Sequence, residues 1–311
     1  MTYNTFIGID IGKFDFVVNL HKTRKTQAYL NSTKGIQAFL EDHQEILPDS
    51  LCVLETTGGY EIELLLTLCQ KEIPVHRANT RKVKNFIRSY GDKGKSDALD
   101  SQALAKYGAE RHAQLDLFEP KSARSMALFE LVQRRRTLVD MRASEKNRLQ
   151  APYAKLTRSS CEETILFLTQ QIDKLTTEIL ALIKQDPFLK EKMKILQSIP
   201  GIGQIVAFEL LILLPELGTL NRRQIASLAG VTPHPRESGL HRGYRRTGKG
   251  RDSIKSLLFI AAMAARNSKS LLKVFYETLV NKGKKKMVAL TALMRKIIVI
   301  ANAKIRDLNM A

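Results

Sequence analysis

Two acidic residues each close an apolar run that has the length and composition of a buried strand. Asp10 follows the run at 6–9, and Glu55 follows the run at 51–54. Open α/β sheets place their functional sites at the carboxyl ends of the strands. The two runs therefore predict that these carboxylates meet at one edge of a sheet.

A second pair of acids begins a predicted helix. Asp97 and Asp100 are three positions apart, so they share one helix face, and Ser96 before them is a typical N-cap. Acids in a first turn also suit the positive end of the helix dipole, so each acid taken singly has an ordinary structural explanation. The other nearby acids are interpreted as surface charges: Asp15, Glu61, Glu63 and Asp92.

Taken together, the four placed acids predict a metal centre. A cluster of carboxylates repels itself unless cations neutralise it, and ligands that are all oxygen select Mg²⁺, with Mn²⁺ as an alternative. Two such ions about 4 Å apart stabilise the attacking and leaving oxygens of phosphoryl transfer. The residues predicted to be both catalytic and metal-ligating are Asp10, Glu55, Asp97 and Asp100.

One serine stands where a nucleophile for phosphodiesters would be useful. Ser238 lies in a stretch bounded by proline and glycine and rich in arginine, whose guanidinium groups can stabilise developing charge. A serine in such a stretch is more often a turn former, and the residues alone leave both interpretations open.

The surroundings of Ser238 are strongly basic. From residue 222 to residue 255, nine basic residues oppose two acidic ones. A glycine-containing basic loop, predicted over 240–251, can lie along a phosphate backbone. The residues predicted to bind nucleic acid are Arg236, Arg242, Arg245, Arg246, Lys249 and Arg251.

The elements that must position these residues begin with strands that alternate with helices. Within residues 1–120, strands are predicted at 6–10, 14–20, 28–30, 51–55 and 73–77, and helices at 34–46, at 60–71 and from about Thr80. This order predicts an α/β domain with a mixed sheet of the ribonuclease H-like type.

Residues 121–195 predict a helical spacer. Apolar residues at 165, 168, 172, 175, 179 and 182 alternate steps of three and four, which is a coiled-coil seam over almost three heptads. The seam can pair within the chain as a helical hairpin or between protomers as a coiled coil, and both remain open. The basic run 134–136 is expected on exposed faces.

Residues 196–311 predict a mainly helical domain. The segment 199–203, with the sequence IPGIG, precedes an apolar helix and has the helix-hairpin-helix pattern. In that pattern, backbone N–H groups at a glycine turn hold a phosphate. Further apolar helices are predicted at 254–265 and 288–305, with a basic loop at 282–286 between them.

The charge of the chain is concentrated in its later part. Residues 1–120 carry 15 basic and 16 acidic side chains, whereas residues 121–311 carry 35 and 15, a net of +20 within the total of +19. Such a field predicts a polyanionic partner, most simply nucleic acid, although a basic surface kept for solubility is the alternative.

Composition limits the remaining classes of protein. Hydrophobic residues make up 44% of the chain, which excludes wholesale disorder, and no apolar run is long enough to span a membrane. Three scattered cysteines and a start unlike a secretory signal predict a cytoplasmic, nucleoid-associated protein.

Six motifs in a fixed order carry a family resemblance: GIDIGK, LETTGGY, KSDALDSQALA, IPGIG, LAGVTPHPRESG and KKMVALTALMRKIIVIANAKIRD. Over essentially its whole length, the chain resembles the DEDD transposases of insertion sequences. In particular, it resembles the IS1111 branch of the IS110 family, which is related to the Piv DNA invertases. The resemblance implies a RuvC-like domain at 1–120, a coiled-coil spacer at 121–195 and a transposase domain at 196–311. By position, its acid tetrad falls on Asp10, Glu55, Asp97 and Asp100, and its nucleophilic serine falls on Ser238.

The resemblance also implies a mechanism and partners. Strand exchange would pass through a covalent phosphoserine linkage between Ser238 and DNA, guided by a structured bridge RNA that pairs with donor and target DNA. The active protein would be a homo-oligomer, a dimer or a tetramer, in which the acids of one protomer work with the serine of another. No ATP would be needed, because each phosphodiester is exchanged for an equivalent bond.

Three other functions account for part of the sequence. A RuvC-like nuclease would use a metal-activated water and leave the Ser238 segment unexplained. A sugar-kinase-like phosphotransferase can also begin with a strand and Asp-Ile-Gly, but it needs ATP-binding glycine motifs and gives no reason for the charge. An architectural DNA- or RNA-binding protein explains the charge and leaves the four placed carboxylates without a role.

Overall fold

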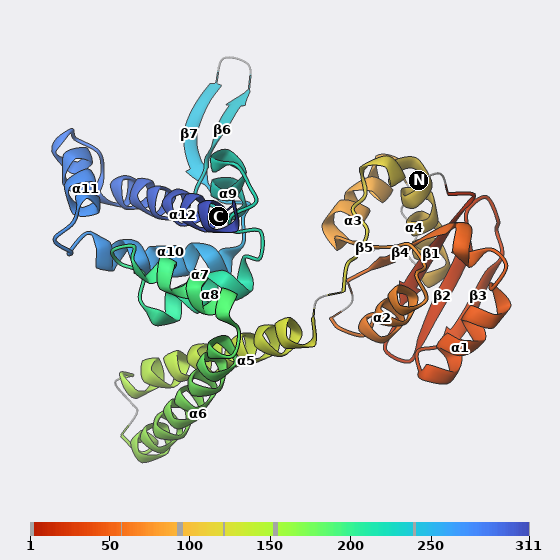
Figure 1. Cartoon of the computed structure of the whole chain (residues 1–311), viewed down its shortest axis with the longest axis horizontal. Coiled ribbons are helices and arrows are strands. Elements are labelled where there is room, and N and C mark those ends of the chain that lie inside the picture. Colours follow the sequence, from red (N-terminus) through yellow and green to blue (C-terminus); the bar gives the residue numbers. More distant parts are fainter. Residues whose placement is uncertain are drawn as a thin grey trace. The chain divides into compact units, whose positions relative to one another are not determined.

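The chain folds into two compact units, Met1–Lys121 and Ser122–Ala311, which we call the sheet unit and the helical unit (Figure 1). The computed structural model describes residues 3–56, 58–91, 96–120, 122–151, 155–238 and 241–310. For residues 236–238, 241, 242, 244 and 245 it describes the backbone alone. A further division of the helical unit near residue 195 stays a prediction. In the described parts of the chain, no helix is both long and apolar enough to cross a membrane.

The sheet unit is built on five strands in the order β3-β2-β1-β4-β5. β1 (Thr5–Ile11), β2 (Asp15–Leu20) and β3 (Thr26–Leu30) form an antiparallel meander. β4 (Ser50–Glu55) pairs in parallel with β1, and β5 (Val75–Ala78) pairs in parallel with β4. The predicted mixed sheet of the ribonuclease H-like type is confirmed.

Helices cover both faces of this sheet. α1 (Thr33–Asp42) and α2 (Ile62–Gln70) share a hydrophobic core with one face. α3 (Thr80–Ser89) and α4 (Asp97–Arg111) share a second core with the other face. Short 3₁₀ turns at Leu47–Asp49 and His112–Gln114 complete the unit.

The pleat of the sheet decides which residues face α3 and α4. Ile9 of β1 and Leu54 of β4 are buried in the core on the α1 and α2 side. Since successive side chains of a strand point to opposite faces, Asp10 and Glu55 belong to the α3 and α4 side. Ile9 also lies opposite Leu54 in the parallel register, so Asp10 and Glu55 end neighbouring strands at the same edge.

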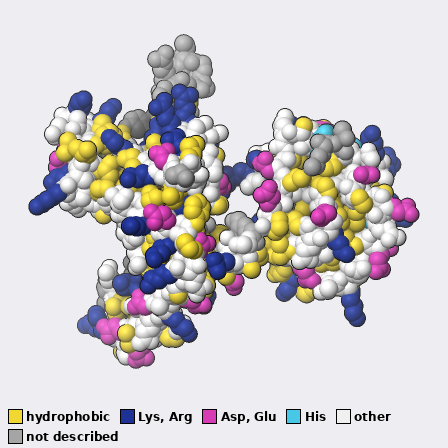
Figure 2. All heavy atoms as spheres, in the orientation of Figure 1, with side chains coloured by type: hydrophobic (Ala, Val, Ile, Leu, Met, Phe, Trp, Pro, Cys, Tyr) yellow, Lys and Arg dark blue, Asp and Glu magenta, His cyan; other side chains and the backbone are white. Residues whose placement is uncertain are grey.

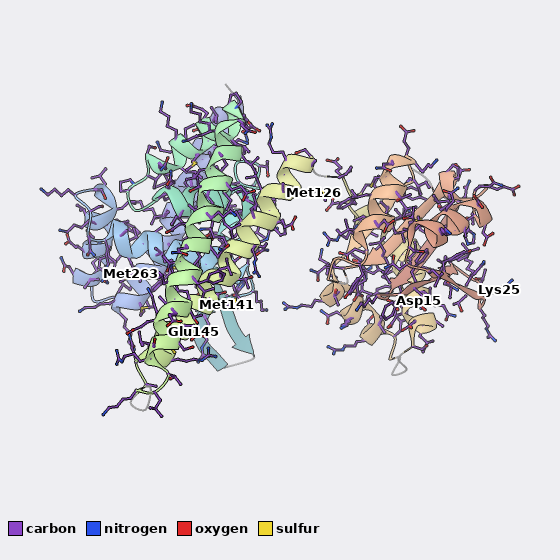
Figure 3. All side chains as sticks on the ribbon, turned by 90° about the horizontal axis from the view of Figure 1, so that it is seen from below. Asp15, Lys25, Met126, Met141, Glu145 and Met263 are labelled. Atoms are coloured by element: carbon purple, nitrogen blue, oxygen red, sulfur yellow. The ribbon has the colours of Figure 1, made fainter. Side chains whose placement is uncertain are left out.

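The helical unit begins with two long helices that pack side by side (Figure 1). They are α5 (Ala123–Leu149) and α6 (Arg158–Lys184). The predicted seam of α6 packs within the chain, since Leu168 and Ile172 are buried against Leu138 of α5. Met126 and Met141, labelled on α5 in Figure 3, are 37% and 49% exposed, so Met141 lies away from the seam.

Six further helices form the main core of the helical unit. They are α7 (Pro187–Gln197), α8 (Gln204–Leu213), α9 (Arg222–Leu228), α10 (Asp252–Ala265), α11 (Leu271–Asn281) and α12 (Lys286–Met310). Leu128 of α5 and Ile179 of α6 belong to the same hydrophobic core as α8 and α10. One end of the α5–α6 pair is therefore built into this core.

A two-stranded hairpin interrupts the helices between α9 and α10. β6 (Pro233–Ser238) and β7 (His241–Thr247) pair antiparallel, with Ser238 opposite His241. The two strands stand out from the helices of their unit (Figure 1). The prediction of a loop over 240–251 is wrong for 241–247, because the polar sequence of β7 lacks the alternating apolar residues by which strands are detected.

Candidate active site: a carboxylate cluster and an arginine-rich hairpin

α4 packs closely against β1 at a glycine. A Cβ built on Gly8 would lie 2.0 Å from the Ser101 carbonyl oxygen and 2.3 Å from the Ala105 nitrogen. Any side chain at this position would push against the α4 backbone, and real Cβ atoms do not tolerate such distances. Gly8 therefore lets α4 lie on β1, one turn after the acids that begin the helix.

The first turn of α4 presents the second pair of acids as predicted. The Ser96 hydroxyl accepts a hydrogen bond from the Leu99 N–H at 3.3 Å, which confirms the N-cap. Asp97 and Asp100 both lie in this first turn, where Asp97 is exposed and Asp100 is partly buried. Their charges face the edge at which β1 and β4 end.

The pKa of Asp10 shows that the four predicted acids share one electrostatic environment. Burial first, and then charge repulsion from Asp100, Asp97 and Glu55, raise this pKa from its usual 3.8 to about 6. Burial also raises the pKa of Glu55, which a hydrogen bond from Thr80 and the charge of Lys84 partly oppose. The fold thus brings together four acids that are far apart in sequence.

The donor atoms at this edge fit a divalent cation. In the described part of the chain, no three His, Cys, Asp or Glu side chains already form a metal ligand set. The groups present are carboxylates, which hard cations such as Mg²⁺ and Mn²⁺ prefer as ligands. A cation here would also relieve the repulsion that raises the pKa of Asp10.

One acid that supports this edge was misjudged from the sequence. Glu61 is fully buried, so its interpretation as a surface charge is wrong. Its carboxylate forms an ion pair with Arg77 of β5 and accepts a hydrogen bond from the Gly59 N–H at 2.9 Å. Glu61 therefore fixes part of the turn that follows Glu55, a role that no local pattern indicates.

The sheet unit has a basic helix although its overall charge is close to neutral. α3 carries four basic side chains and no acidic one, and all four are exposed: Arg81, Lys82, Lys84 and Arg88. Asn79 caps the helix by accepting hydrogen bonds from two backbone N–H groups. Because the charge of Lys84 lowers the pKa of Glu55, this basic face reaches the carboxylate edge. The near-neutral total charge of residues 1–120 gave no sign of such a basic face.

The structure places Ser238 at the end of a hairpin strand. Its backbone is the last position of β6, and residues 239–240 after it lie outside the described residues. The side chains of Ser238, Arg236, Arg242 and Arg245 also lie outside the described part. Arg246 and Lys249 are described and exposed. Figure 2 shows Lys and Arg side chains gathered where the hairpin leaves the helices.

Arg251 has a partner inside the helical unit. Its guanidinium group donates to Glu216 at 2.7 Å and to the Leu213 carbonyl oxygen at 3.0 Å. This pairing ties the start of α10 to the end of α8. We therefore assign Arg251 to the fold in preference to the nucleic-acid-binding set.

The basic run at 134–136 was expected to be exposed, and the structure buries part of it. Arg135 is 6% exposed, and Arg135 and Arg136 each donate to Glu209 of α8 at 2.8 Å. Arg135 also donates to the Thr176 hydroxyl of α6 at 2.8 Å. The expectation of an exposed side chain is wrong for Arg135, whose guanidinium group instead joins α5, α6 and α8.

The IPGIG segment forms the turn between α7 and α8. Gly201 has a φ of +92°, and a Cβ there would lie 2.3 Å from the Ala261 carbonyl oxygen of α10. The glycine is thus required both by its left-handed backbone and by close packing. The first N–H groups of α8 have no side-chain cap at Gly203, and phosphate binding there stays a prediction.

Comparisons with known proteins agree over most of the chain. A family model described as a transposase, DEDD_Tnp_IS110, matches residues 7–155. A second, described as the transposase IS116/IS110/IS902 family, matches residues 193–277. The pilin gene-inverting proteins of Moraxella lacunata and Moraxella bovis are each 27% identical over 312 residues, covering 97% of this chain and 96% of theirs.

Proposed function

The chain belongs to the IS110 family of DEDD transposases, distantly related to the pilin gene-inverting proteins, and on this premise we propose that it exchanges DNA strands through Ser238. Enzymes of this family bind DNA, transfer its strands and depend on a divalent metal. The observation that carries the proposal is the convergence of Asp10 with Glu55, Asp97 and Asp100 at one sheet edge.

The four carboxylates would bind and orient the reacting phosphate through Mg²⁺. When bound, the cation supplies positive charge that neutralises the phosphate oxygens and the leaving oxygen. Asp10 and Glu55 would hold the cation from the strand ends, and Asp97 and Asp100 would hold it from the first turn of α4. The Lys84 ammonium beside Glu55 would favour an approaching phosphate as well.

Ser238 would act as the nucleophile in two balanced steps. In the first, the serine hydroxyl oxygen forms a bond to phosphorus while the bond from phosphorus to the DNA 3′ oxygen breaks. The proton that the serine loses passes to solvent, and the released 3′ oxygen takes up a proton from solvent to become a hydroxyl. In the second, a 3′ hydroxyl of the exchanged strand attacks the phosphoserine and regenerates the serine hydroxyl. Each phosphodiester is replaced by an equivalent one, so no nucleotide cofactor is needed.

The acids and Ser238 belong to different compact units. The proposal therefore requires the sheet unit and the hairpin of the helical unit to meet on one phosphate, within a chain or between chains. We propose a homo-oligomer, a dimer or a tetramer, in which the acids of one protomer serve the serine of another. Support comes from the family resemblance and from the separation of the two groups of residues.

A covalent adduct tests the nucleophile. Duplex DNA carrying the ends of the element that encodes the chain is incubated with full-length protein and Mg²⁺, and phosphoserine is sought by mass spectrometry. Wild type and a Ser256→Ala control, altered at an exposed serine of α10, should form the adduct, whereas Ser238→Ala should not.

The same assay separates recombination from hydrolysis. A nuclease that uses water would cleave DNA with Ser238→Ala as well as with wild type and would leave no protein on the DNA. Cleavage by the Ser238→Ala variant at the wild-type rate would refute the assignment of Ser238.

We further propose that a structured RNA encoded by the element guides the choice of DNA. The support is the family resemblance, and the net charge of +20 after residue 120 is compatible with binding RNA as well as DNA. Sequencing of RNA that copurifies with the full-length protein tests this point. One defined RNA from beside the gene is expected, and a random sample of cellular RNA would contradict guidance.

A further inference from the structure

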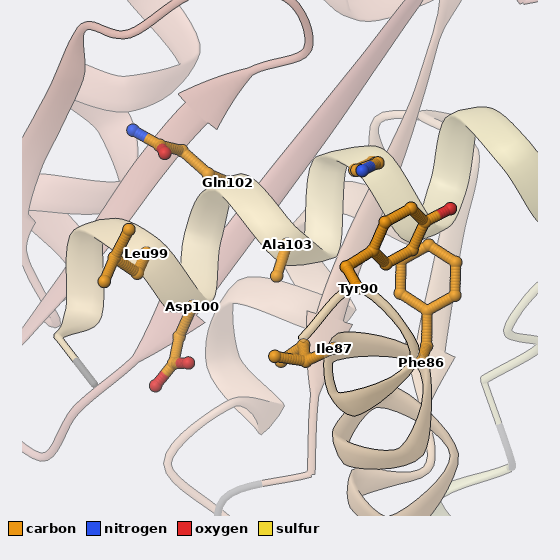
Figure 4. Close-up of a pocket in the computed structure, with 8 residues that line it drawn as sticks. Phe86, Ile87, Tyr90, Leu99, Asp100, Gln102 and Ala103 are labelled. Atoms are coloured by element: carbon orange, nitrogen blue, oxygen red, sulfur yellow. The ribbon is translucent and has the colours of Figure 1, made fainter. Parts of the chain in front are cut away.

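A pocket beside the carboxylate edge has no role in the chemistry described so far. It lies between α3 and α4, encloses about 230 Å³ and is lined in part by Phe86, Ile87, Tyr90, Leu99 and Asp100 (Figure 4). Asp100 thus belongs both to this pocket and to the acid cluster. A group that fills the pocket is therefore a close neighbour of any phosphate held by the acids.

The walls of the pocket are apolar and partly open to solvent. Tyr90 is 44% exposed and Leu99 is 47% exposed, whereas Phe86 behind them is buried. Phe86 meets the Tyr90 ring edge-on, with the ring centroids 5.2 Å apart. Packing against Phe86, a hydrogen bond from the Tyr90 hydroxyl to Glu110 and the Lys106 ammonium over one face hold the Tyr90 ring at the pocket before any ligand is bound.

Polar groups stand at the rim of the same pocket. The Lys106 ammonium lies 3.3 Å from the centroid of the Tyr90 ring. Gln102 also lines the pocket, but its amide nitrogen donates to the Arg24 carbonyl oxygen at 3.5 Å. The Asp100 carboxylate lies on the side that faces the acid cluster. Apolar walls with donors and acceptors at the rim suit a flat heteroaromatic group such as a nucleobase.

The neighbouring surface of α3 indicates how a strand would arrive. A polar hollow of about 710 Å³ is lined by Thr56, Thr80, Arg81, Lys84 and Arg88. Its Thr80 and Lys84 act on Glu55, so this basic hollow reaches the acid cluster from the β4 side. The basic hollow and the apolar pocket therefore both adjoin the acids, one next to Glu55 and the other at Asp100.

We propose that the pocket between α3 and α4 receives one unpaired base of the DNA strand whose phosphate lies at the carboxylates. The backbone of that strand would follow the basic hollow, and the base would leave its stack to lie against Tyr90, Ile87 and Leu99. Lys106 would contact the edge of the base. This inference rests on the proposed strand exchange at the acids and adds a subsite to it.

The base would anchor the strand next to the bond that reacts. Stacking of a base on an aromatic side chain changes affinity by about 5- to 100-fold in proteins that bind single strands. An unpaired base is available when the strands have been opened, so the pocket would favour opened DNA over closed duplex. The expected effect of losing the Tyr90 ring is a loss in this range for the opened strand alone.

Photocrosslinking tests the subsite without requiring catalysis. Full-length protein is bound to an oligonucleotide that carries 5-iodouracil in a short unpaired stretch, irradiated, digested and analysed by mass spectrometry. Crosslinks to the peptide that contains Tyr90 are expected in wild type. They should disappear in Tyr90→Leu and in Ala103→Phe, which fills the pocket while keeping the Tyr90 ring.

A matched control uses another exposed ring covered by a lysine. Phe188 of α7 is 50% exposed and lies under Lys192, whose Nζ atom is 4.0 Å from the ring centroid. Phe188→Leu should leave the Tyr90 crosslink unchanged. Binding of the unpaired stretch should weaken about 5- to 100-fold in Tyr90→Leu, and binding of closed duplex should stay the same.

The outcome is separable from that of the proposed function. If the oligonucleotide binds and crosslinks only elsewhere, or if both pocket variants bind and crosslink like wild type, the subsite is refuted whatever the adduct assay on Ser238 shows. If the Tyr90 crosslink forms and the Ser238 adduct does not, the base subsite stands and the nucleophile assignment fails.

Discussion

Neutralising Asp10 should make the metal-free protein more stable at neutral pH. The pKa of Asp10 is raised to about 6, first by burial and then by the charges of Asp100, Asp97 and Glu55. Because this pKa is higher in the folded than in the unfolded chain, the stability linked to the protonated group is present at low pH. It is lost as the pH rises through about 6. An Asp10→Asn variant keeps the shape of the side chain and removes the charge.

The size of the effect follows from the pKa. A rise from 3.8 to about 6 corresponds to at most about 3 kcal/mol, and solvent screening at a partly exposed carboxyl reduces this to about 1–2 kcal/mol. We therefore expect Asp10→Asn to stabilise the sheet unit by about 1–2 kcal/mol at pH 7.5 in the presence of a chelator. Near pH 4.5 wild type and variant should differ little.

Adding Mg²⁺ should make wild type more stable than Asp10→Asn. A cation at a hundred times its dissociation constant adds about 2.7 kcal/mol to the folded state that binds it. Wild type would gain this stabilisation, whereas Asp10→Asn would gain less because one ligand charge is gone. At pH 7.5 the wild-type protein should then be the more stable of the two.

Hydrogen exchange is the suitable assay because the chain has two compact units. Exchange of peptides from β1 and β4 reports the opening of the sheet unit alone, with chelator and with Mg²⁺. Asp15→Asn is the matched control, since Asp15 (Figure 3) is an exposed carboxylate on the neighbouring strand β2. If Asp10→Asn destabilises the metal-free sheet unit at pH 7.5, the four carboxylates do not repel one another and the inferred cluster is wrong.

Three further variants test packing around the site. Gly8→Ala should lower the free energy of unfolding by at least about 1–3 kcal/mol, measured by thermal unfolding, because the new Cβ meets the α4 backbone. It should also abolish strand cleavage. In the control Gly203→Ala the new Cβ points into open space, so unfolding of the sheet unit should be unchanged. Glu209→Ala should cost about 3–5 kcal/mol in urea unfolding because the Arg135 charge stays buried without its partner, and Arg148→Ala, at an exposed pair, should cost less than about 1 kcal/mol. Glu61→Gln should lower the cleavage rate, measured by single-turnover kinetics, more than it lowers the affinity for DNA, measured by titration. Equal losses in rate and affinity would contradict the role of Glu61 in fixing the turn after Glu55.

The strand-end acids could be found from the sequence because their signal is local. Asp10 and Glu55 directly follow short apolar runs, and Ser96 stands in the cap position before Asp97. Each of these patterns is complete within a few residues. The sheet that brings them together follows from the order of strands and helices, so both the fold and the acid cluster were within reach.

Buried charges could not be found in the same way because their partners are distant. Glu61 pairs with Arg77, sixteen positions away, and Arg135 pairs with Glu209, seventy-four positions away. A charged residue is usually exposed, so without its partner each was interpreted as part of the surface. Only the folded chain shows that these charges hold elements together.

The hairpin was missed for a different reason. β7 reads His-Arg-Gly-Tyr-Arg-Arg-Thr, in which basic residues take the places that an apolar face would occupy in most strands. Its pairing with β6 depends on backbone hydrogen bonds, which have no signature in the residue types. Ser238, predicted to lie in a turn bounded by proline and glycine, is instead the last residue of β6.

The boundary at Lys121 has a consequence for how such a gene decays. Every strand and helix of the sheet unit, and all four acids, are encoded before codon 122. A frameshift between codons 122 and 238 would remove Ser238 and leave the sequence of the sheet unit, which holds the carboxylates, intact. The shortened protein is expected to compete with the full-length protein for the same phosphates. Damaged copies of the gene would then encode inhibitors of the intact enzyme.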